Sequence, residues 1–116
     1  MTVERANTIL YCRRFHETLA FYEEGLGLRV LTRRDWFVEF HLGPDSALSI
    51  ADERRATIRS AEGRGVTISL RVRDAARTRD ELVAAGLEPA PMRRSWGSPA
   101  FFIHDPEGHR LEVWSP

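Results

Sequence analysis

The chain has 116 residues, 42% of them hydrophobic, and its 17 basic side chains balance 17 acidic ones. This length suits one domain of ordinary size, and the neutral charge with ordinary apolar content argues against wholesale disorder. Every basic residue is arginine, which excludes Schiff-base lysine chemistry and a P-loop lysine. The single cysteine, Cys12, excludes an internal disulfide and a cysteine-rich zinc site, and we expect it to be buried.

The sequence shows no sign of a nucleic-acid or membrane partner. Its arginines are spread along the chain and form no basic stripe. No apolar run approaches the ~20 residues that a membrane-spanning helix needs, and no signal-peptide pattern opens the chain. We therefore expect a cytoplasmic protein that binds neither nucleic acid nor membrane.

In chain order, the first elements are a strand, a helix and strands joined by turns. Residues 8–14 read as a strand, and the apolar residues that follow recur at spacings of four, three and four, which predicts one helix over residues 14–25. The turn residues of segment 41–45 lead into a strand over residues 47–50. The apolar stripe of the predicted helix consists of Phe15, Leu19, Tyr22 and Leu26.

The same order of elements returns 60 residues later. A strand is predicted over residues 67–74 and a helix near residues 74–85. Asp74 is the expected N-cap of this helix, and Gly86 is its expected stop. The repeat predicts the order strand, helix, strand, strand, strand twice.

The two repeats define a first module of about residues 1–57 and a second of about residues 58–116, within a single domain. Residues 52–65 are charged and punctuated by glycine, and we interpret them as the linker. One module is too small to bury both its helix and its sheet face, so we expect the two modules to pack together. The expected fold class is α+β, with two βαβββ modules.

Two signatures of the chain resemble the vicinal oxygen chelate superfamily. They are a Phe-Tyr pair at 21–22 followed by Gly-Leu-Gly-Leu at 25–28, and Asp-Pro-Glu-Gly at 105–108 followed by Leu-Glu at 111–112. That superfamily includes glyoxalase I, fosfomycin-resistance enzymes, ring-cleaving dioxygenases and bleomycin-resistance proteins. The resemblance implies mixed sheets that curl around a cavity, and it implies a homodimer.

The resemblance also implies four strand positions at which the enzymes of the superfamily hold a divalent metal. Here an amide and two hydroxyls accompany one carboxylate, a set that does not hold a catalytic metal tightly. We therefore expect no metal and no cofactor. A site outside this pattern, built from Glu39, His41 and His104, is the alternative to a solvated strand face, and we expect His104 and His109 at the surface. The four positions are Asn7, Ser49, Thr67 and Glu112.

Strand alternation predicts which side chains share the cavity face. The resulting wall mixes aromatic and hydrogen-bonding groups, which suits a planar aromatic or amphipathic small molecule. The parity of residues 101–104 is open, so either Phe101 or Phe102 faces inward. The predicted ligand-binding residues are Asn7, Ile9, Tyr11, Trp36, Ser49, Thr67, Ser69, Arg71, Trp96, Phe102, Glu112 and Trp114.

Four of these residues have alternative roles. Trp36 and Trp96 either flank the ligand like jaws or pack in the core or a dimer interface. Arg71 and Glu112 are expected to form a buried pair when no ligand is bound, because an unpaired buried charge is costly.

We therefore predict a non-catalytic protein that binds an antibiotic or another natural product, a route to resistance by sequestration. The neutral chain favours a ligand less charged than the cationic bleomycin. The alternative is a lyase, isomerase or dioxygenase of the same superfamily, either metal-dependent or metal-free with Glu112 as general base. A third reading is a structural or regulatory dimer with a vestigial cavity.

Overall fold

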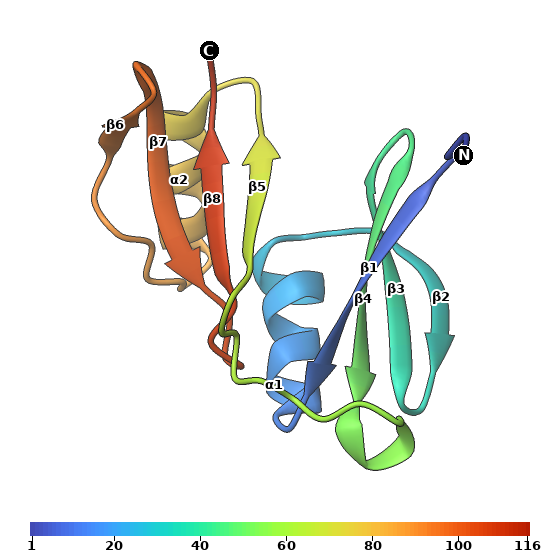
Figure 1. The fold of residues 1–116 in the computed structure, drawn as a ribbon. Coiled ribbons are helices and arrows are strands. Elements are labelled where there is room, and N and C mark those ends of the chain that lie inside the picture. Colours follow the sequence, from blue (N-terminus) through green and yellow to red (C-terminus); the bar gives the residue numbers. More distant parts are fainter. The chain divides into compact units, whose positions relative to one another are not determined.

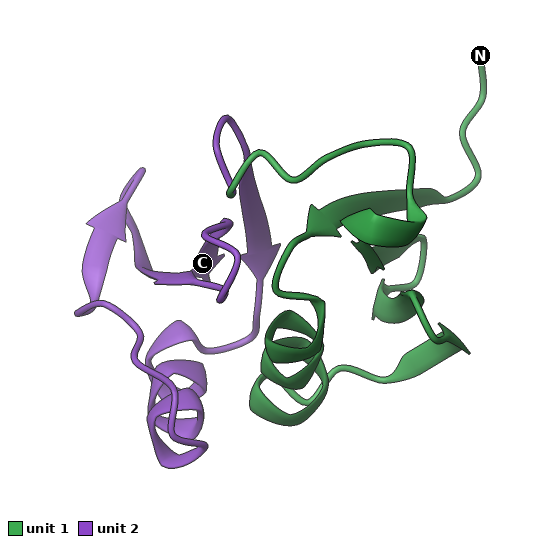
Figure 2. Cartoon of the chain, turned by 90° about the horizontal axis from the view of Figure 1, so that it is seen from below, with its two compact units in different colours: residues 1–62 green, residues 63–116 purple.

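The computed structural model describes residues 1–116 and divides into two compact units, residues 1–62 and 63–116 (Figure 2). Each unit contains a strand, a helix and three further strands in that order (Figure 1). The fold is therefore α+β with two βαβββ-like modules, each with a four-stranded mixed sheet. Curling of the sheets around a cavity stays a prediction. Across the chain, no helix has the length and apolar character that crossing a membrane requires.

In unit 1, the strands are ordered β1-β4-β3-β2, and β1 runs parallel to β4 while the other pairs are antiparallel. The helix predicted as one piece has two parts, because its second half widens to a π-helix in which the Leu26 amide donates to the carbonyl of Phe21 at 2.8 Å. The elements are β1 (Ala6–Cys12), α1 (Phe15–Ala20), η1 (Phe21–Gly25), β2 (Val30–Arg34), β3 (Phe37–Gly43), β4 (Ser46–Asp52) and η2 (Glu53–Arg55).

In unit 2, the order β5-β8-β7-β6 repeats this arrangement, with β5 parallel to β8. The predicted helix ends are confirmed: the Asp74 side chain accepts a hydrogen bond from the amide of Arg77 at 3.0 Å, and Gly86 follows the helix with φ +87°. The elements are β5 (Thr67–Arg71), α2 (Ala75–Ala84), β6 (Arg93–Ser95), β7 (Ser98–His104) and β8 (Arg110–Trp114).

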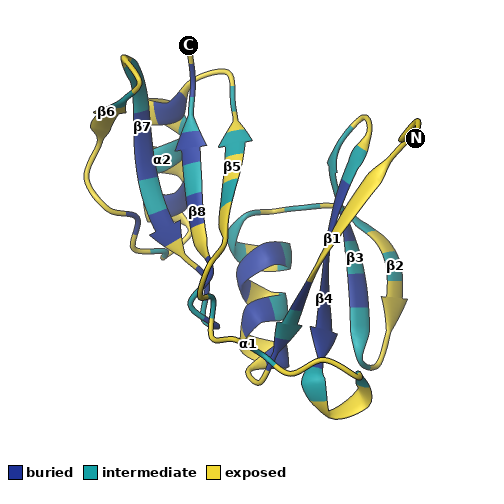
Figure 3. Cartoon of the chain, in the orientation of Figure 1, coloured by how far each residue is buried: buried dark blue, intermediate teal, exposed yellow.

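Each unit has its own core between its helix and one face of its sheet (Figure 3). In unit 1 the ring of Tyr22 packs 6.0 Å from that of Phe40, between centroids, which joins η1 to β3. Cys12 is buried, as predicted. The buried apolar side chains include Leu10, Phe15, Val38, Leu48 and Ile50 in unit 1, and Ala75, Leu82, Phe101, Ile103, Leu111 and Val113 in unit 2.

The opposite side of each sheet, here called the open face, carries the side chains that alternate with the core residues. Phe101 is fully buried, whereas Phe102 is partly exposed. Phe102 therefore belongs to the open face of unit 2, which resolves the parity that the sequence left open.

One surface expectation was wrong. His104 is exposed, but His109 is buried. The cause is the turn at 105–108: one carboxylate oxygen of Asp105 accepts from the amides of Glu107 and His109, and the other lies 2.8 Å from Nδ1 of His109. The same carboxylate thus folds the turn and holds the imidazole ring inside.

This turn gives a testable prediction for Gly63. A Cβ added at Gly63 would lie 2.1 Å from the carbonyl carbon of Gly108, a backbone atom that cannot swing aside. Gly65 has a similar φ, +82° against +80°, but open space around it. Gly65→Ala should therefore cost about 1–2 kcal/mol for its left-handed backbone, and Gly63→Ala should cost about 1–3 kcal/mol more for the steric overlap. Urea denaturation of the two variants measures the difference, and equal losses would contradict the packing described.

Candidate functional site

The open face of unit 2 is centred on Glu112 of β8. In the strand register, Ser69 of β5 stands opposite Glu112 on one side and Phe102 of β7 on the other. The hydroxyl of Ser69 donates to Oε1 of Glu112 at 2.9 Å, and the hydroxyl of Ser95 donates to Oε2 at 3.0 Å. Both carboxylate oxygens are thus oriented by hydroxyl groups from two different strands.

A pocket of about 280 Å³ opens beside this carboxylate. Two tryptophans supply its aromatic surface, and three serines with the carboxylate supply its polar surface. Sequence reasoning missed two of the serines, since they flank a short hairpin whose strand β6 has no apolar alternation. The pocket is lined by Ser69, Ser95, Trp96, Ser98, Glu112 and Trp114.

Trp96 stands in an unusual backbone conformation. It forms the two-residue loop between β6 and β7 with Gly97, and the two residues have φ +53° and +80°. Loops with two positive φ angles favour Asn-Gly, and a bulky side chain at positive φ is a true outlier. Trp96 is also fully exposed, so packing within the fold does not offset this strain. Such strain points to a role for the exposed ring itself.

The expected buried pair of Arg71 and Glu112 is wrong. Glu112 is satisfied by serine hydroxyls, and Arg71 is exposed, with its guanidinium carbon 5.6 Å from the ring centroid of Trp114. Thr67 does not approach Glu112 either, because its hydroxyl accepts from Nε of Arg110 at 2.9 Å.

Unit 1 has a matching pocket of about 270 Å³. Three predicted residues line it, Ile9 and Tyr11 of β1 and Trp36 of the β2–β3 turn. Sequence reasoning missed its far wall, which lies in the segment interpreted as linker. The remaining lining residues are Phe37, Ala51, Arg55, Ala56 and Thr57.

The ion pair that shapes this wall joins Asp52 and Arg54. The buried Asp52 carboxylate accepts from the backbone amide of Arg54 at 3.0 Å and from its guanidinium at 2.8 Å. The side-chain hydrogen bonds from Arg54 hold the pKa of Asp52 below its ordinary value of 3.8. This contact fixes the start of η2, from which the lining residues 55–57 follow.

The four positions at which the superfamily holds a metal do not fit one in this chain. Ser49 is buried and its hydroxyl donates to Oδ1 of Asn7 at 2.7 Å, so these two groups satisfy each other. The hydroxyl of Thr67 accepts from the guanidinium of Arg110, whose positive charge would repel a metal ion at this position. Glu112 is the sole carboxylate of the set, and no cluster of three His, Cys, Asp or Glu side chains offers an alternative.

Of the alternative ligands outside the pattern, the one carboxylate is also engaged. The carboxylate of Glu39 accepts from Arg5 at 2.9 Å and from the hydroxyl of Thr32 at 3.0 Å. The hydrogen bond from Arg5 holds the pKa of Glu39 below its ordinary value of 4.5. A cation from the protein itself therefore occupies the place where a metal would sit beside Glu39.

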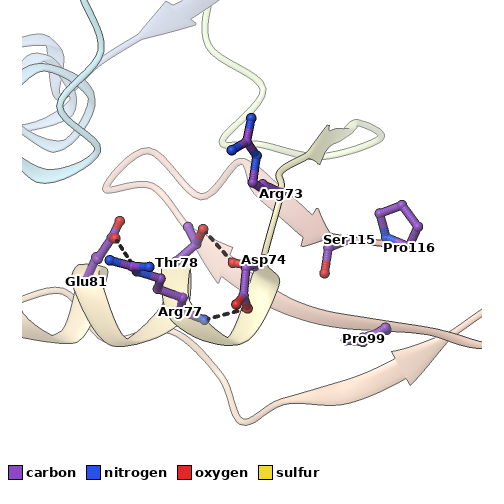
Figure 4. Close-up of a pocket in the computed structure, with 8 residues that line it drawn as sticks. All are labelled: Arg73, Asp74, Arg77, Thr78, Glu81, Pro99, Ser115 and Pro116. Carbon is purple, nitrogen blue, oxygen red and sulfur yellow. Dashed lines mark hydrogen bonds and ion pairs between the residues drawn. The ribbon is translucent and has the colours of Figure 1, made fainter.

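A third hollow, of about 620 Å³, lies at the start of α2 (Figure 4). Its polar groups bond to one another: the Ser115 hydroxyl accepts from the amide of Ala75 at 3.0 Å, and Asp74 caps the helix. Arg77 and Glu81 form an exposed ion pair at 3.7 Å. The hollow has no aromatic wall, so the two aromatic pockets are the better candidates for a ligand.

The Asp52 contact predicts a pH dependence. Because the pKa of Asp52 is lowered in the folded state, the stabilisation is present above the ordinary value of 3.8 and is lost as pH falls from there through the lowered value. Asp52→Asn should remove this part of the acid destabilisation, whereas Asp80→Asn, at an exposed helix position, should not. Urea midpoints measured across this range test the prediction, and identical acid slopes for Asp52→Asn and the wild type would contradict it.

The positive φ of Trp96 predicts that this tryptophan lowers the stability of the fold. Trp96→Asn should raise the free energy of unfolding by about 1 kcal/mol, because asparagine tolerates the left-handed conformation. Trp96→Leu keeps the strain and should give no gain. Chemical denaturation of both variants provides the measurement. A Trp96→Asn variant less stable than the wild type would show that the ring packs within the fold.

Comparison with known proteins agrees with this architecture. Similar solved structures include a lactoylglutathione lyase from Agrobacterium tumefaciens, with 21% identity, TM-score 0.75, and coverage of 95% of this chain and 91% of that one. A glyoxalase/bleomycin resistance protein from Catenulispora acidiphila has 18% identity and TM-score 0.78, with 99% of both chains covered. A protein of unknown function from Agrobacterium tumefaciens has 25% identity and TM-score 0.75, with 100% and 94% covered.

No curated protein matches the sequence. The family model of the Glyoxalase/Bleomycin resistance protein/Dioxygenase superfamily matches residues 5–113, nearly the whole chain. Together with the two βαβββ-like units, this match identifies the chain as a member of that superfamily.

Proposed function

We propose that the protein is a non-catalytic binding protein for a small molecule with a planar aromatic or amphipathic body, of the kind found among antibiotics and other natural products. One observation carries the proposal: an oriented carboxylate, that of Glu112, lies in a pocket between two tryptophans. The predicted homodimer stays part of this proposal.

The chemistry of the unit 2 pocket supports such a ligand. The rings of Trp96 and Trp114 offer flat apolar surfaces on which a planar body can stack. Glu112 can accept a further hydrogen bond from the ligand, and charged hydrogen bonds contribute about 1.5–3 kcal/mol. The volume of about 280 Å³ is close to the lower end of small-molecule sites, which span roughly 300–1,000 Å³.

The enzymatic alternatives find less support in the same residues. A metal-dependent reaction needs ligands that the four superfamily positions do not supply. For a metal-free reaction, Glu112 would have to act as a general base, and no second titratable side chain lines its pocket to serve as the acid. Superfamily membership alone does not choose among these functions, since its name covers lyases, dioxygenases and resistance proteins.

The test is a tryptophan-fluorescence screen against planar natural products, followed by titration of Glu112→Gln with any compound that binds. This variant keeps the shape of the side chain and removes its charge, so affinity should fall by roughly one to two decades. Glu88→Gln, an exposed residue of the same unit, is the matched control and should bind as the wild type does. Unchanged affinity in Glu112→Gln, or loss of wild-type binding after treatment with a chelator, would overturn the proposal.

A further inference from the structure

The open face of unit 2 carries an unbalanced set of positive charges. Along its four strands, the positions of this face include three exposed arginines, Arg71, Arg93 and Arg110, and only one acidic residue, Glu112. Glu112 bonds to serines and forms no ion pair with any of the three. Elsewhere in the chain, arginines do have carboxylate partners, as Arg5 has in Glu39.

Aromatic rings hold all three of these guanidinium groups. The guanidinium carbon of Arg71 lies 5.6 Å from the ring centroid of Trp114. Those of Arg93 and Arg110 lie 4.8 and 4.4 Å from the ring centroid of Phe102. A guanidinium on a ring face can still donate from its N–H groups to an anion and has already lost part of its conformational freedom. In Arg110, Nε donates to Thr67, so its two terminal nitrogens are the ones left for an anion. The arginines are therefore pre-positioned, although no anion of the protein meets them.

The strand register places these groups next to residues that line the pocket, although the arginines themselves do not line it. Arg71 stands opposite Trp114, which lines the pocket, and Phe102 stands opposite Glu112. On β6, Arg93 precedes by two residues Ser95, which donates to Glu112. A molecule that extends beyond the pocket from Trp114 or Glu112 along the open face therefore meets strand positions that carry these guanidinium groups.

The unit 1 pocket shows the same combination independently. Arg55 lines it together with Tyr11, Trp36 and Phe37, and Arg55 is exposed and forms no ion pair. An arginine without a carboxylate partner thus lines the unit 1 pocket, and three such arginines stand on the open face of unit 2, at strand positions next to the residues that line its pocket.

We propose that the ligand of the unit 2 pocket carries an anionic group, a carboxylate, sulfonate or phosphate, beside its planar body, and that Arg71, Arg93 and Arg110 bind this group. The inference rests on the proposed binding function and specifies its ligand class. A ligand with negative groups and no hydrogen-bond donor would be repelled by the carboxylate of Glu112. The ligand therefore also carries an N–H or O–H group that donates to that carboxylate. The ligand class is therefore an aromatic acid with a hydrogen-bond donor.

The test compares three probes that share one ring and differ in charge: indole-3-acetate, indole-3-acetamide and tryptamine, which are anionic, neutral and cationic at neutral pH. Calorimetric or ligand-detected NMR titration should give the anion about tenfold tighter binding than the amide, with the amine weakest. Because the arginines are exposed, this advantage should shrink in about 0.5 M salt.

Variants then assign the effect to the arginines. The double variant Arg93→Gln/Arg110→Gln should lower the affinity for the anion about tenfold and leave that for the amide unchanged. Arg73 is an exposed arginine outside the pocket. Arg73→Gln removes the same type of charge and should change neither the affinity for the anion nor that for the amide. Arg71→Gln provides a single substitution if the double variant fails to fold, as judged by circular dichroism.

The outcomes separate this inference from the proposed function. If the amide or the amine binds as tightly as the anion, the anionic ligand class is overturned while small-molecule binding stands. If Arg73→Gln lowers the affinity for the anionic probe as much as the double variant does, the effect comes from the net charge of the protein and not from the three arginines, and the inference fails. If none of the probes binds, the inference fails, and the natural-product screen decides the proposed function separately.

Discussion

One helix can cover only one face of a four-stranded sheet, and this limit organises both units. In unit 1 the helix side takes the large apolar residues, such as Phe40 and Ile50, and in unit 2 it takes Phe101 and Leu111. Since side chains alternate along a strand, every residue that packs against a helix leaves its neighbours on the open face. The core therefore fixes where the candidate ligand-binding side chains point, because they are attached to the same strands.

The two units use this shared scaffold for different chemistry. At matching places in the register, unit 1 pairs Ile9 with Ser49, whereas unit 2 pairs Ser69 with Glu112. The unit 1 pocket is accordingly aromatic and apolar with one arginine at its edge, and the unit 2 pocket is a carboxylate among serines and tryptophans. A repeat that is nearly symmetric in its backbone is thus asymmetric in its side chains, and only unit 2 places a fixed negative charge in its pocket.

Local patterns in the sequence were enough to predict the order of the elements, the cap at Asp74 and the burial of Cys12, because periodicity and capping depend on neighbouring residues. Contacts between side chains distant in sequence were harder to predict. The pair expected between Arg71 and Glu112 failed because Ser95, on a hairpin without apolar alternation, reaches the carboxylate instead. The prediction that His109 lies at the surface failed because its burial depends on the Asp105 carboxylate, which bonds to three groups of the same turn.

The strained loop at Trp96 has an evolutionary consequence. A single substitution to asparagine or glycine would relax the backbone at this position, so drift alone would be expected to remove the tryptophan from a lineage that gained nothing from it. Under the proposed function, ligand binding is what retains the exposed ring against this gain in stability. On that proposal, homologues that do not bind the ligand are free to adopt Asn-Gly, and the identity of this one residue would separate members that bind from those that retain only the fold.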